Sequence, residues 1–154
     1  MKNIVSCLVV FLIMFSSEVT ASSLMDGINL FNGKEFIQAK MIFSKLDKKG
    51  DSRAMFWLGV TQFRTGEQFK AGSTLLKAAE KGDPWAMHLM VPSYNGYCDY
   101  LGWDCDESWM KKAISGWKKL EVKGDGKAMY ALLRWGINLG GRLFPSSIRE
   151  TIYH

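Results

Sequence analysis

Two closely spaced cysteines are the residues of this chain best suited to covalent or metal chemistry. Cys98 and Cys105 are separated by six residues. A metal site would need more thiolate or imidazole ligands than this pair supplies, and the sequence has two histidines, His88 and His154. Redox-active pairs usually have a two-residue spacer. The favoured interpretation is a structural disulfide, formed within one chain or between two, which would add roughly 2–3 kcal/mol of stability.

Motifs of known catalytic sites are missing from the sequence. It has neither Gly-x-Ser-x-Gly nor His-Glu-x-x-His, and no glycine loop that would hold a phosphate. His88 follows Met87 in an apolar helical context, which favours a partly buried structural histidine over a general base. We therefore expect no enzymatic activity, no cofactor and no metal; a hydrolase is the less favoured alternative.

Aromatic residues recur at every third position before and between the cysteines, at Tyr94, Tyr97, Tyr100 and Trp103. Large rigid side chains on a surface loop are common anchors for a protein partner. The alternative is that they fold back and pack on the neighbouring helices. Asp106 is expected to cap the helix that follows the loop.

Other candidates for partner binding lie on the predicted helices. Lys111 and Lys118 are seven residues apart and share one side of a helix. They form either a solvated face or a basic patch for an acidic partner or anionic lipid. Trp85 is a further candidate on the helix before the loop. A net charge of +5 over 154 residues is small for a nucleic-acid-binding protein, so we do not expect nucleic acid as a partner.

The N-terminal segment 1–21 has the features of a secretory signal peptide. Lys2 precedes 12 mostly apolar residues, at positions 4–15, which are too few to span a membrane. The polar stretch that follows ends in Val-Thr-Ala, which predicts cleavage after Ala21. We expect a periplasmic or secreted protein without a membrane span after cleavage. An uncleaved N-terminal anchor is the alternative.

One phrase, Lys-Gly-Asp-x-x-Ala-Met, occurs three times, at residues 49–55, 81–87 and 123–129. The lysine can end one helix, the glycine can adopt a left-handed backbone, and the aspartate can cap the next helix. Each phrase therefore predicts a joint between two helices. The glycines of successive phrases are 32 and 42 residues apart, which indicates an internal repeat with an insertion of ten residues in its third unit.

The helices before these joints share an apolar pattern at steps of four and three residues. An alanine precedes each glycine by eleven residues, and a large apolar residue precedes it by seven. No alternating strand pattern competes, so the predicted fold class is all-α. Helices are expected over residues 23–32, 34–48, 51–65, 67–80, 83–95, 106–122 and 125–139, with a loop between the fifth and sixth.

The chain resembles the Sel1-like and tetratricopeptide repeat family through Ala54-x-x-x-Leu58-Gly59, Ala71 and the run from Leu76 to Asp83. The resemblance implies a short α-solenoid of stacked helix–turn–helix repeats over residues 22–144, followed by a C-terminal tail, 145–154. It also implies that cysteines can link two helices of a repeat. The packing residues that it implies are Gly50, Ala54, Ala71, Gly82, Ala86, Ala113, Gly124 and Ala128.

The expected function is that of an exported, non-enzymatic interaction module of the bacterial envelope. It would bind a protein through the concave face of its helices and the aromatic loop 94–107. Small exported Sel1-like proteins resemble immunity proteins that neutralise type VI secretion effectors, notably phospholipases. Alternatives are an envelope adaptor or assembly factor, a host-directed virulence factor and a polysaccharide-binding protein. The sequence leaves the oligomeric state open.

Overall fold

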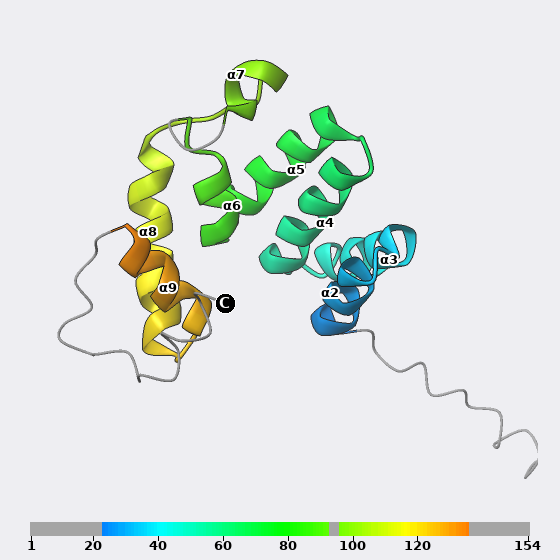
Figure 1. The fold of residues 1–154 in the computed structure, drawn as a ribbon, viewed down its shortest axis with the longest axis horizontal. Helices are drawn as coiled ribbons and strands as arrows, with labels where there is room; N and C mark the ends of the chain where they lie inside the picture. Colours follow the sequence, from blue (N-terminus) through cyan, green and yellow to red (C-terminus); the bar gives the residue numbers. More distant parts are fainter. Residues whose placement is uncertain (1–22, 93–95, 136–154) are drawn as a thin grey trace, which may run out of the picture.

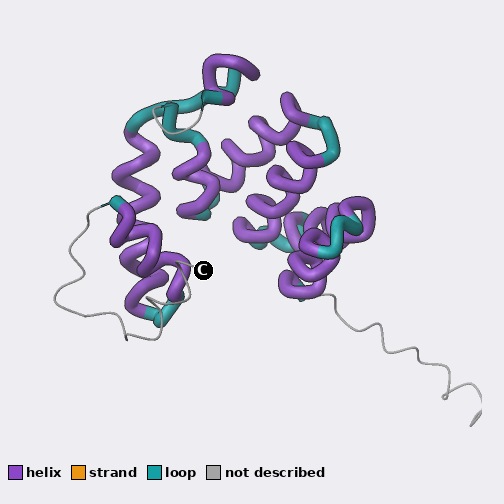
Figure 2. The backbone as a smooth tube through the Cα atoms, viewed as in Figure 1, coloured by secondary structure: helices purple, strands orange, loops and turns teal. Residues whose placement is uncertain are grey.

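The computed structural model describes residues 23–92 and 96–135. The predicted signal peptide, Tyr94 and the C-terminal tail lie outside these residues. All regular secondary structure in the described part is helical, which confirms the all-α fold class (Figure 2). None of the described helices has the length and apolar character needed to span a membrane.

The helices pack largely in the order in which they follow along the chain. Helix α2 contacts α3, α3 contacts α4, α4 contacts α5, α5 contacts α6, α6 contacts α8, and α8 contacts α9. Figure 1 shows the resulting curved row, with α2 and α3 at one end and α8 and α9 at the other. The bounds are α2 Leu24–Asn32, α3 Phe36–Asp47, α4 Ser52–Arg64, α5 Gln68–Glu80, α6 Pro84–Leu89, α7 Tyr97–Leu101, α8 Ser108–Val122 and α9 Gly126–Arg134.

The three Lys-Gly-Asp phrases form the same local structure. Asp51 and Asp83 each accept hydrogen bonds from two backbone N–H groups in the first turn of the next helix, and Asp125 accepts from one. These bonds satisfy donors that have no partner within a helix. The preceding glycines have positive φ angles of 88° at Gly50, 95° at Gly82 and 84° at Gly124. The sequence prediction of three helix joints is confirmed.

Small residues allow neighbouring helices to approach closely. At Gly59 an added Cβ would lie 2.7 Å from Leu75 Cγ, and at Gly116 it would lie 2.7 Å from Pro84 Cβ. A larger side chain at either position would force two helices apart. The alanines that the sequence pattern assigned to packing are all fully buried: Ala54, Ala71, Ala86, Ala113 and Ala128.

The third predicted helix pair differs from expectation. Helix α6 ends at Leu89 rather than at residue 95, because Val91 precedes Pro92 and a residue before proline disfavours the helical conformation. The predicted loop contains a short helix, α7. The chain then returns to the end of α6, where the Asp106 N–H donates to the Met90 carbonyl oxygen at 3.1 Å. The Asp106 carboxylate accepts from the Ser108 N–H at 2.8 Å, so it satisfies a donor in the first turn of α8 from the position before the N-cap residue, Glu107.

Candidate functional site

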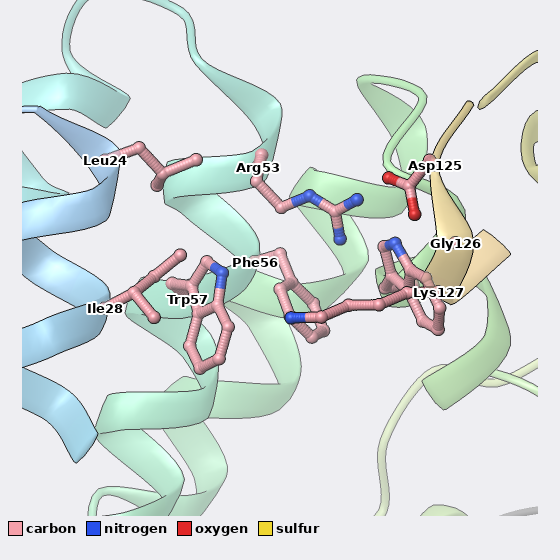
Figure 3. A pocket seen from close by; sticks show the side chains of 9 residues that line it. Leu24, Ile28, Arg53, Phe56, Trp57, Asp125, Gly126 and Lys127 are labelled. Carbon is pink, nitrogen blue, oxygen red and sulfur yellow. The ribbon is translucent and has the colours of Figure 1, made fainter. Parts of the chain in front are cut away.

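A groove runs between the two ends of the curved row of helices. One cavity of about 680 Å³ is lined by residues of α2, α4, α6 and α9 and by Asp125 (Figure 3). A second, of about 340 Å³, is lined by residues of α4, α6, α8 and α9 and by Trp135. Both are lined in part by Phe56 and Trp85, so the two cavities are adjacent. We call the combined surface the aromatic groove; its other rings come from Trp57, Trp117, Tyr130 and Trp135.

Helices α4, α6 and α9 present corresponding faces to the aromatic groove. Each begins after a capping aspartate, and residues two, five and six positions after that aspartate line the groove. These steps keep side chains on one helical face. The repeated joint therefore fixes which face of each helix is turned to the groove. The residues are Arg53, Phe56 and Trp57 on α4, Trp85, His88 and Leu89 on α6, and Lys127, Tyr130 and Ala131 on α9.

Arg53 ties helix α4 to the start of α6. Its Nε lies 3.4 Å from Asp83 Oδ2, and its guanidinium carbon lies 5.7 Å from the ring centre of Phe56 and 5.4 Å from that of Trp85. Figure 3 shows the guanidinium directed toward the side of the groove where Asp125 lies. Burial lowers the pKa of Arg53, and the charges of Asp83 and Asp125 oppose that shift. The positive charge of Arg53 is thus largely compensated within the protein.

Asp83 combines two roles at this junction. Its side chain is 3% exposed, and its Oδ1 accepts from the backbone N–H groups of Trp85 and Ala86 at 3.0 and 2.8 Å. Burial raises the pKa of the carboxyl, while Arg53 and the two backbone donors lower it. The net shift is upward, so the cap and the ion pair offset only part of the cost of burying the charge.

The two long walls of the aromatic groove differ in chemistry. Leu24 and Ile28 of α2 and Trp57 of α4 form an apolar wall. On the opposite side, α9 contributes Lys127 to the larger cavity, and it contributes Arg134 to the second cavity. Both side chains are exposed, and neither forms an ion pair with any residue that the structure describes. In Figure 3 the Lys127 side chain extends from α9 into the groove.

His88 lies among indole rings at the second cavity. Its ring centre is 5.1 Å from that of Trp117 and 5.5 Å from that of Trp135, both in edge-to-face arrangements. Burial lowers the pKa of His88 to about 4, so the imidazole is neutral at neutral pH. This placement agrees with the interpretation of His88 as a partly buried structural residue.

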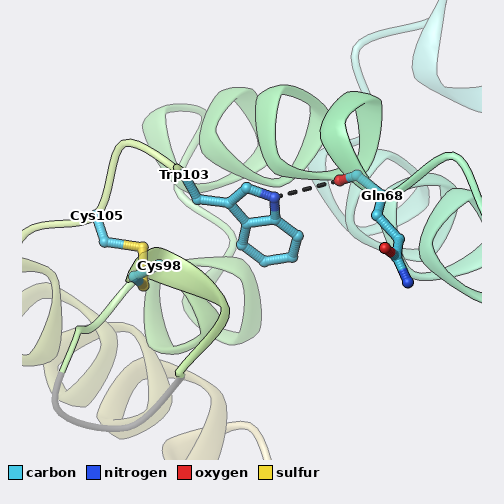
Figure 4. The surroundings of a disulfide bond; sticks show 4 residues. All are labelled: Gln68, Cys98, Trp103 and Cys105. Carbon is cyan, nitrogen blue, oxygen red and sulfur yellow. Dashed lines mark hydrogen bonds between the residues drawn. A yellow bond between two sulfur atoms is a disulfide. The ribbon is translucent and has the colours of Figure 1, made fainter. Parts of the chain in front are cut away.

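The loop before α8 is closed by a disulfide and packed onto α5. The Cys98 and Cys105 sulfur atoms are bonded within one chain, 2.06 Å apart (Figure 4). Trp103 is only 9% exposed, and its indole N–H donates to the Gln68 carbonyl oxygen at 3.2 Å. It lies so close to Gly72 that an added Cβ there would be 2.4 Å from its Cδ1. For Trp103 the packing alternative is therefore the one that the structure supports.

The other predicted partner-binding residues are dispersed. Tyr97 is 46% exposed, with its ring centre 4.8 Å from that of Phe63, whereas Tyr100 is 83% exposed. Lys111 and Lys118 are exposed on α8 but do not line the aromatic groove. Of the candidates in the described residues, only Trp85 lies in the groove.

Sequence reasoning missed most of the groove. Phe56, Trp57 and Tyr130 look like ordinary apolar positions of amphipathic helices, and Lys127 and Arg134 like solvated ones. The common offsets of Phe56, Trp57, Tyr130 and Lys127 from the capping aspartates are visible in the sequence and could have identified these four; Arg134 does not share them. The sequence alone did not show how the row of helices curves, and this curvature turns the helical faces toward one another.

The described residues contain no group of three or more histidine, cysteine, aspartate or glutamate side chains arranged to hold a metal ion. Comparison of the chain with family models, with curated proteins and with solved structures found no match in any of the three. The geometry and charge of the aromatic groove are therefore the basis for assigning a function.

Proposed function

We propose that this chain is an exported, non-enzymatic module that binds a protein partner in the aromatic groove. The observation that carries the proposal is the shared register of α4, α6 and α9, which brings aromatic and cationic side chains together along two adjacent cavities. Tryptophan, tyrosine and arginine are the residue types most enriched among those that dominate protein interfaces. A groove of this size can take several side chains of a partner.

The proposed architecture is a short α-solenoid similar to Sel1-like and tetratricopeptide repeats. Three equivalent joints, packing between successive helices and a set of buried alanines support it. Helices stacked in this way commonly produce a concave binding face. In this proposal the aromatic groove is that face, and the disulfide-closed loop stabilises the third repeat.

The proposed location is the periplasm or the exterior, after cleavage of residues 1–21. The disulfide supports this proposal, because structural disulfides persist mainly in oxidising compartments. N-terminal sequencing of protein recovered from the cell envelope should begin at Ser22. A chain that retains residues 1–21 and sediments with membranes would instead indicate an uncleaved anchor.

The cellular role that we propose is an immunity protein for a type VI secretion effector, such as a phospholipase. A small binding module with no metal cluster in its described residues suits a role in which tight binding alone is sufficient. Affinity capture followed by mass spectrometry tests this role. A toxic effector, encoded beside this gene, is the expected partner. Recovery of resident envelope proteins would favour an adaptor or assembly factor, and a host protein would favour a virulence factor.

The same capture experiment separates groove binding from loop binding. Tyr130→Ala removes a groove side chain that is 43% exposed, and Tyr100→Ala removes a loop side chain that is 83% exposed. We expect Tyr130→Ala to weaken partner binding about tenfold or more, and Tyr100→Ala to have little effect. The reverse pattern would assign binding to the loop. If neither substitution changes binding, the groove proposal is wrong.

A further inference from the structure

The apolar wall of the aromatic groove sets the first requirement for a ligand. Leu24, Ile28 and Trp57 are each only partly buried, and all three line the larger cavity. Water is removed from these side chains only if the ligand covers them with apolar groups of its own. One side of the bound segment must therefore be apolar.

The α9 wall sets the second requirement. Lys127 and Arg134 are seven residues apart, which places them on one face of the helix about 10 Å apart along its axis. Tyr130 lies between them on the same wall. Within the described residues neither cation has an ion-pair partner, so both can interact with a ligand.

The remaining charged groups, Arg53, Asp83 and Asp125, carry a formal net charge of −1, so they offset only one of these two cations. Arg53 is engaged by Asp83. The Asp125 carboxylate also lines the groove, but its Oδ1 accepts from the Ala128 N–H at 3.0 Å and its charge acts on Arg53. Within the described residues, these groups therefore leave a formal net charge of +1, and the exposed cations lie on α9.

We propose that the aromatic groove binds an acidic, amphipathic peptide segment of the partner. The apolar side chains of the segment cover Leu24, Ile28 and Trp57, and its carboxylates face Lys127 and Arg134. This inference rests on the proposed function and adds the chemistry of the partner to it. A second copy of this chain is disfavoured, because pairing two such grooves would bring like charges together.

The two walls contribute in different ways. Exposed ion pairs are individually weak, whereas apolar and aromatic contacts at the centre of an interface supply most of the affinity. Charges at the rim chiefly raise the association rate and select against basic partners. The affinity should therefore fall as the salt concentration increases, while the part of the affinity that depends on the aromatic side chains remains.

Selection from a random peptide library displayed on phage tests the proposal with the purified chain. We expect the enriched peptides to carry a net negative charge together with aliphatic or aromatic residues. Their affinity, measured by fluorescence polarisation, should fall about tenfold or more in the double variant Lys127→Glu and Arg134→Glu. The matched control, Lys111→Glu and Lys118→Glu, makes the same charge change on α8 outside the groove and should have a small effect.

Several outcomes would overturn the proposal. They are enrichment of basic or uncharged peptides, no enrichment, and equal losses in the groove and control variants. If charge reversal impairs folding by circular dichroism, the variant Lys127→Gln and Arg134→Gln is measured in its place. Binding to phosphatidylglycerol vesicles that depends on Lys127 and Arg134, without enrichment of acidic peptides, would assign the groove to lipid. If Tyr130→Ala abolishes natural partner binding and charge reversal does not, this inference fails and the proposed function stands.

Discussion

At the scale of single residues, His88 makes the stability of the protein depend on pH. The pKa of His88 in the folded chain is about 4, below the ordinary value of 6.5. Below pH 6.5 the unfolded chain takes up a proton that the folded chain does not. The contribution of neutral His88 to the free energy of unfolding is therefore fully present above this pH and is lost as the pH falls toward 4. The loss is at most about 1.4 kcal/mol per pH unit. Urea unfolding at pH 7.5, 6.5 and 5.5 measures it.

The variant His88→Gln controls for the other titrating groups. It retains a polar side chain but has no proton to gain in this range. The fall in stability between pH 6.5 and 5.5 should be smaller in this variant than in the natural chain. An identical pH dependence in both proteins would show that His88 is not the source.

Asp83 should be the most sensitive of the three capping aspartates. Asp83→Ala removes both the cap of α6 and the partner of Arg53, whereas Asp51→Ala removes a cap without that ion pair. Loss of a cap costs about 0.5–2 kcal/mol, and leaving a buried group unpaired adds about 1–3 kcal/mol. We expect Asp83→Ala to reduce the free energy of unfolding more than Asp51→Ala. Equal effects would mean that the ion pair contributes nothing.

At the scale of elements, the packing of the loop before α8 onto α5 depends on one close contact. An added Cβ at Gly72 would lie 2.4 Å from Trp103 Cδ1, so Gly72→Ala must displace the indole or the helix. We expect the free energy of unfolding, measured by thermal or urea unfolding, to fall by about 1–3 kcal/mol, with a change in tryptophan fluorescence. Gly126→Ala is the control, because its Cβ would meet nothing within 4 Å. If Gly72→Ala is as stable as this control, Trp103 does not pack there.

The helix joints were predictable because their determinants are local. Glycine with positive φ followed by a capping aspartate specifies a turn whatever surrounds it, as at Gly82 and Asp83. The early end of α6 was missed, although Pro92 carried the signal. The position of Trp103 was not predictable, because it depends on Gly72, 31 residues away in the sequence, and on the return of the chain after α7.

At the scale of the whole molecule, successive packing predicts that stability is graded along the chain. Helices α4 and α5 each pack on a neighbour at either side, whereas α2 packs mainly on α3, and α9, within the described residues, on α8. Elements packed on one side can open without disturbing the rest. Native-state hydrogen exchange should therefore show the greatest amide protection in α4 and α5 and less in α2 and α9. Because both of these outer helices line the aromatic groove, a bound partner should raise their protection most. Equal protection in all helices would instead show that the chain opens as one cooperative unit.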